Sequence, residues 1–147
     1  MRLQALHERT HLPAHPGRAP RVKRILVAED DPETAAALKL NLEDRLAVAT
    51  NVVTNGALVL DQLTATPPDL LILDVSLPGL NGVDVFDLIR GSARFGKVPV
   101  LFVTATPDRA REAFAHCGIS DVMAKPFDGD ALARRVSDLL ELATAAA

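Results

Sequence analysis

The sequence contains one cysteine, no tryptophan and no tyrosine, and each scarcity excludes a class of protein. The single thiol, Cys117, permits no internal disulfide and no cysteine-rich zinc site, which is typical of a reducing compartment. With only five phenylalanines, the stacking surfaces that hold flavins and single-stranded nucleic acids are nearly absent. No uncharged apolar run approaches the roughly 18 residues of a membrane span. We therefore expect a cytoplasmic protein without a membrane span.

The 147 residues suit one domain of ordinary size, since 48% of them are hydrophobic and 24% are charged. The net charge of −3 conceals an uneven distribution along the chain. Residues 1–24 contain six basic side chains and one acidic one, whereas the remaining residues contain 10 basic and 18 acidic groups, a balance of −8. An acidic domain repels nucleic-acid phosphates. Direct binding to DNA or RNA is therefore not expected.

The first 21 residues are predicted to form a flexible basic arm, ahead of a domain that spans residues 22–147. Three prolines and a glycine lie between residues 13 and 20, and no apolar period is sustained there. Three histidines, His7, His11 and His15, would share one face of a helix and could then bind a metal ion. Because the prolines interrupt such a helix, a solvated tail is the preferred interpretation.

From residue 22 onward, short apolar runs alternate with segments of helical spacing. The expected strands lie at Ile25–Ala28, near Ala47–Val53, at Leu70–Leu73, at Val98–Val103 and near Asp121–Ala124. Helical faces include Ala35, Leu38, Leu42 and Leu46 in the first helix, and Leu132, Val136, Leu139 and Leu140 in the last. Five strands that alternate with five helices predict a parallel sheet covered on both faces.

Polar side chains gather where these strands end. Glu29-Asp30-Asp31 follows the first strand, Asp74 follows the third, Thr104 follows the fourth and Lys125 follows the fifth. Because ligands of doubly wound sheets bind at the carboxyl ends of the strands, we expect carboxylates, a hydroxyl and an ammonium to meet at one edge. This convergence is the strongest functional signal in the sequence.

The four acids call for different interpretations. Asp31 precedes Pro32, a residue suited to the first helical position, and is predicted to be a helix N-cap. Glu29 and Asp30 would repel each other at a buried strand end, and a divalent cation is the usual compensation. Asp74 ends a strand of central character before a loop rich in turn residues, where a carboxylate can ligate a metal or act as a nucleophile.

The other two polar residues are weaker signals when each is taken alone. Thr104 is of a type common in strands and at helix caps. Lys125 lies between a short strand and Pro126, and its ammonium suits a phosphoryl or carboxylate oxygen.

In these motifs the chain is similar to the receiver domains of two-component response regulators, in particular to single-domain, chemotaxis-regulator-like members. The similarity covers about residues 22–143. It rests on Ile25-Leu26-Val27-Ala28-Glu29-Asp30-Asp31, on Pro68-Asp69-Leu70-Leu71-Ile72-Leu73-Asp74 with Leu77-Pro78-Gly79 and Gly82, on Val103-Thr104-Ala105, and on Lys125-Pro126-Phe127. The resemblance implies a flavodoxin-like, doubly wound sheet of five parallel strands in the order 2-1-3-4-5 with five helices.

The resemblance also implies a site. Asp74 would be the phosphoacceptor, loaded from a phosphohistidine on a sensor histidine kinase or a histidine phosphotransfer protein. Mg²⁺ would be held by Asp30, Asp74 and the backbone carbonyl of Ser76, with Glu29 acting through water. Such a protein is not an enzyme with a separate substrate, because it takes part only in its own phosphoryl transfer and autodephosphorylation.

Lys125 and Thr104 complete the implied site, with Lys125 pairing one phosphoryl oxygen and Thr104 hydrogen-bonding another. The family further suggests a cis bond before Pro126. It often carries Tyr or Phe three residues before the lysine, a side chain that swings inward when the threonine moves. Here that position is Val122, which cannot repeat an aromatic rotamer change, so we predict altered or weaker coupling to the surface of the last two helices and last strand.

The same residues disfavour two other functions. Phosphohydrolases of the haloacid-dehalogenase type usually place a second Asp two residues after the phosphorylated one, where this chain has Ser76. A flavodoxin-like cofactor binder would need a turn that cradles phosphate, whereas the acidic turn at residues 29–31 repels it. Within signalling, three roles stay open: a stand-alone receiver acting by protein–protein contact, including a phosphorylation-dependent dimer; a phosphate shuttle or sink; and a phosphorylation-independent scaffold.

Overall fold

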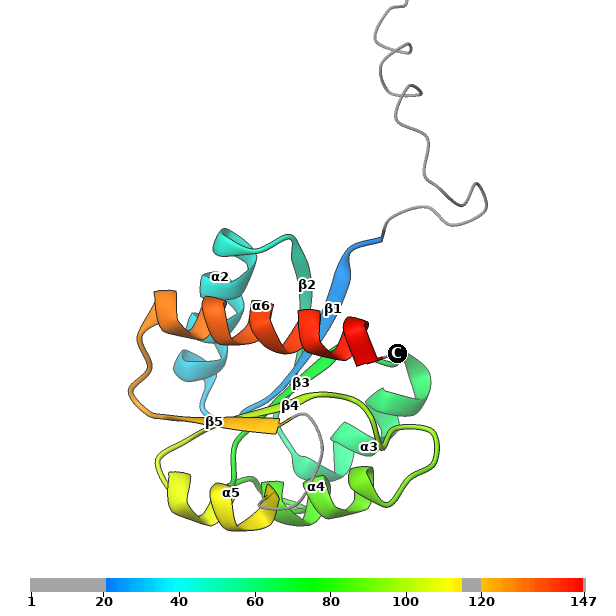
Figure 1. Ribbon diagram of the computed structural model, residues 1–147. Coiled ribbons are helices and arrows are strands. Elements are labelled where there is room, and N and C mark those ends of the chain that lie inside the picture. Colours follow the sequence, from blue (N-terminus) through cyan, green and yellow to red (C-terminus); the bar gives the residue numbers. More distant parts are fainter. Residues whose placement is uncertain (1–20, 115–119, 147) are drawn as a thin grey trace, which may run out of the picture.

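The computed structural model describes residues 21–114 and 120–146 of the protein (Figure 1). The predicted arm, its three histidines and Cys117 lie outside these residues, apart from Arg21. The strands are β1 (Lys23–Ala28), β2 (Val48–Val53), β3 (Leu70–Leu73), β4 (Val100–Thr104) and β5 (Ser120–Ala124). The helices are α2 (Pro32–Arg45), α3 (Gly56–Ala65), α4 (Gly82–Arg90), α5 (Pro107–Phe114) and α6 (Gly129–Ala146).

The five strands form one parallel sheet in the order β2-β1-β3-β4-β5. The predicted architecture and strand order are therefore confirmed. Every connection from one strand to the next passes through a helix, so each strand ends at the same edge of the sheet (Figure 1). Within the described residues, no helix is long and apolar enough to cross a membrane.

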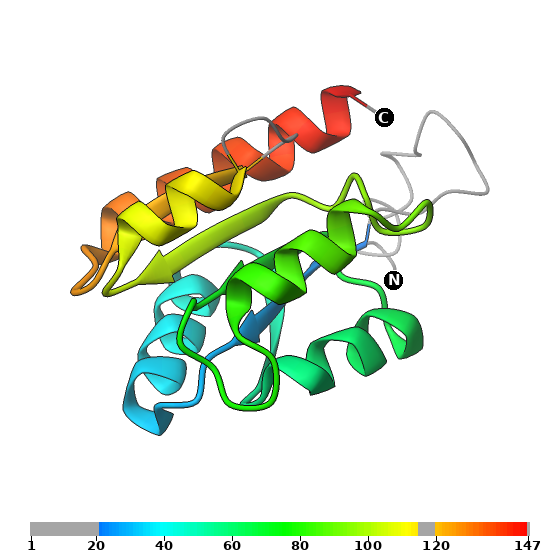
Figure 2. The ribbon, with the colours of Figure 1, turned by 90° about the horizontal axis from the view of Figure 1, so that it is seen from below.

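The helices divide between the two faces of the sheet: α2 and α6 cover one face, and α3, α4 and α5 cover the other (Figures 1 and 2). The strands supply this two-sided core because successive side chains point to opposite faces. In β1, Ile25 and Val27 pack toward α2 and α6, whereas Leu26 and Ala28 pack toward the other three helices. All four side chains of β3 are buried, as expected for the central strand.

Two strand boundaries differ from the sequence prediction by two residues at their start. β1 begins at Lys23, and β4 begins at Val100 and includes Thr104. Val98 belongs to the preceding turn, because its N–H donates to the carbonyl of Phe95 and its own carbonyl accepts from the Arg90 guanidinium. The N–H and carbonyl groups of Val98 are therefore not free to pair with a neighbouring strand, as a longer β4 would require.

Arg21 and Asp69 join the start of the described chain to the opposite edge of the sheet from the strand carboxyl ends. The guanidinium donates two hydrogen bonds to the Asp69 carboxylate, at 2.7 and 3.1 Å, and the Arg24 N–H donates a third at 2.7 Å. Although burial alone would raise it, the pKa of Asp69 is lowered by these bonds. The contact anchors the chain directly before β1.

Candidate functional site

Three carboxylates meet at the carboxyl edge of the sheet, as the sequence predicts. Glu29 and Asp74 directly follow β1 and β3, and their N–H groups continue the strand pairing by donating to the carbonyls of Val53 and Ala28. These backbone bonds orient both side chains, which are only 2% and 5% exposed. Asp30 is exposed. One carboxylate oxygen from each of the three lies within 4.8 Å of the others; we call Glu29, Asp30 and Asp74 the acid cluster.

Lys125 reaches the acid cluster from the end of β5. Its Nζ donates to Oε1 of Glu29 at 2.7 Å and to Oδ2 of Asp74 at 2.8 Å. The backbone N–H of Lys125 donates to the carbonyl of Thr104, and the following bond to Pro126 is cis, as the resemblance implied. The ammonium therefore bridges two buried carboxylates that lie 96 and 51 residues away in the sequence.

Two opposing effects set the pKa values in the site: burial disfavours the charged form of each group, and hydrogen bonds to opposite charges favour it. Burial raises the pKa of Glu29 above 4.5, because desolvation of the carboxylate outweighs its hydrogen bonds from Lys125 and Asp31. Burial also disfavours the charged form of Lys125, but its bonds to Asp74 and Glu29 prevail and raise the pKa of that ammonium above 10.5. When all three carboxylates are ionised, the single ammonium leaves two negative charges uncompensated, the charge that one divalent cation neutralises.

The donor set fits Mg²⁺. Carboxylate oxygens are hard ligands, and Mg²⁺ is usually held by one or two of them while it keeps several waters. The exposed side of Asp30 leaves the acid cluster open to solvent, so retained waters have room. Ser76, whose backbone carbonyl is the third predicted ligand, lies two residues beyond Asp74 and is exposed.

Two other predicted residues occupy the same edge with local partners. The Thr104 side chain is 1% exposed, and its Oγ1 accepts from the Thr106 N–H at 3.1 Å and lies 3.2 Å from the Thr106 hydroxyl. Asp31 is the N-cap of α2, as predicted, since its carboxylate accepts from the N–H and hydroxyl of Thr34. Asp31 is thereby committed to the helix end.

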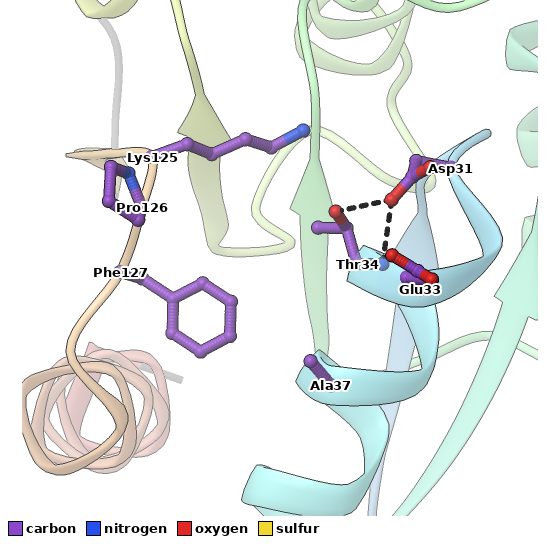
Figure 3. A pocket seen from close by; sticks show the side chains of 7 residues that line it. All are labelled: Asp31, Glu33, Thr34, Ala37, Lys125, Pro126 and Phe127. Carbon is purple, nitrogen blue, oxygen red and sulfur yellow. Dashed lines mark hydrogen bonds between the residues drawn. The ribbon is translucent and has the colours of Figure 1, made fainter.

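A groove of about 530 Å³ borders the site between the first turn of α2 and the start of the β5–α6 connection (Figure 3). Its lining residues are Asp31, Glu33, Thr34, Ala37, Lys125, Pro126 and Phe127. Phe127 faces the α2 residues across the opening, and the Lys125 side chain extends past its rim (Figure 3). We call this the side groove. Periodicity alone does not reveal it, because it arises only when two segments about 90 residues apart are packed side by side.

Val122 lies inside the core between β5 and the helices of the α3–α5 face. It is 6% exposed and aligned with Phe102 of β4. Phe102 contacts Phe86 of α4 and Phe114 of α5, with ring centroids 5.5 and 6.4 Å apart. In this layer β4, α4 and α5 supply Phe102, Phe86 and Phe114, and the turn before β4 supplies Phe95, while the β5 position holds a small residue.

Comparison with known proteins agrees with this geometry. Residues 25–137 match the family model described as the response regulator receiver domain. The chain belongs to this family. Its fold is similar to that of a putative response regulator from Chloroflexus aurantiacus, with a TM-score of 0.76, 31% identity, and coverage of 82% of this chain and 99% of that one.

Curated relatives of this receiver domain are longer proteins. The chain is 38% identical over 118 residues to the transcriptional activator protein IrlR of Burkholderia pseudomallei and 35% identical over 115 residues to the DNA-binding response regulator MtrA of Mycolicibacterium smegmatis. The aligned part is 80% and 78% of this chain but 50% and 49% of those proteins. It is also 30% identical over 120 residues to the sensor histidine kinase TmoS of Ectopseudomonas mendocina, covering 81% of this chain and 12% of TmoS.

Proposed function

We propose that this receiver domain accepts a phosphoryl group on Asp74, in a reaction that requires Mg²⁺ and draws on a phosphohistidine of a sensor histidine kinase or phosphotransfer protein. The observation that carries the proposal is the placement of Asp74. Its carboxylate is 5% exposed, lies beside two other acids, and is hydrogen-bonded to the Lys125 ammonium at 2.8 Å. Phosphoryl transfer needs positioning and charge neutralisation more than it needs a base, and this edge of the sheet offers both.

The transfer forms one bond to phosphorus and breaks another. A carboxylate oxygen of Asp74 attacks phosphorus, the P–O bond forms, and the P–N bond to the donor imidazole breaks with its electron pair leaving on nitrogen. Lys125 can pair with the negative charge that the phosphoryl group brings, because its ammonium already lies within hydrogen-bond distance of Asp74. Bound Mg²⁺, held by Asp30, Asp74 and the Ser76 carbonyl with Glu29 acting through water, would neutralise the phosphoryl oxygens.

Phosphorylation adds roughly −1.5 to −2 charge to the site. The Thr104 hydroxyl lies next to this charge on the neighbouring strand end and is bonded to Thr106 in the structure. We propose that it turns to donate to a phosphoryl oxygen, which releases the Thr106 N–H at the start of α5. Such an exchange of hydrogen bonds would shift the equilibrium between two conformations of this surface.

For output we propose contact with another protein, with the domain acting on no separate substrate of its own. The acidic balance of the chain after residue 24 disfavours nucleic acid as the direct target. A second candidate role is that of a phosphate shuttle or sink. The small side chain of Val122 favours it, because passing on a phosphoryl group needs no aromatic switch.

Intact mass after incubation with acetyl phosphate tests the site directly. We expect a single phosphoryl adduct that requires Mg²⁺ and is absent from Asp74→Asn, a nearly isosteric change that leaves the fold intact. Circular dichroism of the variant is the control. A folded Asp74→Asn protein that still gains one Mg²⁺-dependent adduct would show that another residue is the acceptor.

A further inference from the structure

The acid cluster is held from one side by a segment that contributes no carboxylate to it. This segment, residues 53–56, joins the end of β2 to the start of α3. At its first residue, the Val53 carbonyl accepts the N–H of Glu29 at 3.0 Å. At its last residue, the Gly56 N–H donates to the carbonyl of Pro78 at 2.9 Å. Segment 53–56 therefore contacts both the strand end that carries Glu29 and the loop that follows Asp74.

The loop at residues 76–81 lies so close to segment 53–56 that a Cβ added to either glycine at the contact would overlap the opposite segment. A Cβ on Gly56 would overlap the backbone carbonyl of Leu80. Gly79 has a φ of +82°, in the left-handed region that favours glycine, and a Cβ there would overlap the Asn55 side chain. Asn55 is held rigid in turn, because it caps α3 by accepting the Ala57 N–H at 2.7 Å.

The far end of the same loop closes on the phosphoacceptor. The Gly82 N–H donates to the Val75 carbonyl at 2.8 Å, and a Cβ on Gly82 would overlap the carbonyl of Asp74. The loop that carries Ser76 is thus clamped between Gly82 at one end and Asn55 and Gly56 along its length. The contacts with Asn55 and Gly56 lie two to four residues beyond Ser76 in this loop.

We propose that Asn55 and Gly56 are positioning residues for the divalent-cation site: they set where the Ser76 carbonyl lies and so determine Mg²⁺ affinity, although neither touches the ion. The inference rests on the proposed function, since it takes Ser76 as a ligand. Substitution of a residue that holds a metal ligand in place typically changes metal affinity 10- to 100-fold. We therefore expect substitutions at Asn55 and Gly56 to change Mg²⁺ affinity more than substitutions elsewhere on the surface do.

The test is the Mg²⁺ dissociation constant of the full chain, measured by calorimetric titration on Gly56→Ala at a temperature where the variant is folded. We expect an increase of about tenfold, because the overlap with Leu80 must be relieved by moving the loop. Gly96→Ala is the matched control. A Cβ there also crowds a backbone carbonyl, that of Ser92 at 2.7 Å, but in the loop before β4 at the opposite edge of the sheet. We expect its dissociation constant to match that of the wild type.

A purely structural role would lower the midpoint of urea unfolding in both variants while leaving the Mg²⁺ dissociation constant of each unchanged, and this result would overturn the proposal. If Gly56→Ala does not fold, Asn55→Ser decides, because serine still caps a helix but is too short to fill the space against Gly79. We expect weaker Mg²⁺ binding from it, and wild-type affinity would refute the proposal. A wild-type protein that binds no Mg²⁺ would instead overturn the proposed function.

Discussion

Lys125 is the residue on which the charge balance of the acid cluster depends. Its ammonium is the hydrogen-bond donor shared by Glu29 and Asp74, two carboxylates that are almost completely buried. Removing one partner of a buried ion pair leaves uncompensated charge, which costs more than the pair itself contributes. The lysine side chain is 22% exposed, so solvent screens part of this effect.

We expect Lys125→Ala to lose about 2 kcal/mol of unfolding free energy in metal-free buffer, measured by urea denaturation. Phosphorylation by acetyl phosphate should also weaken, while Mg²⁺ affinity changes little because the lysine is not among the ligands. Arg111→Ala is the control: its pair with Asp108 is exposed on both sides, and such pairs contribute about 0–1 kcal/mol. A large drop in Mg²⁺ affinity would show that the role of Lys125 is wrongly assigned.

At the scale of single elements, α2 connects the fold to the site. Its N-cap, Asp31, directly follows Asp30 of the acid cluster, and its buried face of Ala35, Leu38 and Leu42 fixes the helix against the sheet. Asp31 is the N-cap and Pro32 takes the first helical position, so the helix with its cap starts directly after Asp30. The helix start therefore determines where the backbone of Asp30 can lie.

Substitution of Asp31 tests whether it serves as the N-cap of α2 while Asp30 belongs to the acid cluster. We expect Asp31→Ala to lower the unfolding free energy, because the helix loses its capping hydrogen bonds, and Asp31→Asn to retain most of the wild-type stability. Chemical denaturation of both variants gives the comparison. If Asp31→Ala kept wild-type stability but lost Mg²⁺ affinity, then Asp31 would be a ligand and its N-cap assignment incidental.

On the scale of the whole molecule, Glu29 and Lys125 make the stability of the protein depend on pH in the absence of metal. Glu29 has a raised pKa because it is buried, so the folded chain binds its proton more tightly than the unfolded chain does. Between pH 4.5 and the raised value, the native state holds more of this proton, and the linkage relation makes stability fall as pH rises. Lys125 contributes in another window: its stabilisation is present below pH 10.5 and is lost as pH rises through its raised pKa.

The unfolding free energy of the wild type relative to Glu29→Gln should therefore decrease as pH rises from 4.5 into the neutral range in the presence of a chelator. Urea unfolding at several pH values gives both curves, and the difference between them isolates Glu29 from groups such as Asp69. Saturating Mg²⁺ should reduce the decrease, because the cation compensates the ionised carboxylates. Parallel curves in chelator would contradict the assigned origin of the raised pKa.

The sequence alone was sufficient for the architecture and for the residues at the carboxyl edge. β3 was predicted at its observed bounds, since a run of four apolar residues between Asp69 and Asp74 is too short for a helix and suits a buried strand. The alternation of strands and helices then placed the polar strand ends together, because parallel strands share one carboxyl edge. The capping role of Asp31 was equally local, being encoded by the proline that follows it.

Only the tertiary structure decided which of these residues touch. Lys125 reaches Glu29 across 96 residues. The side groove and the close approach of Gly56 to the 76–81 loop likewise join segments whose spacing in sequence carries no period. The glycines at 56 and 79 were visible in the sequence, but their significance depends on how closely two backbones approach. Periodicity records which side of an element is buried, whereas contacts between distant loops are set by the packing of the helices against the sheet.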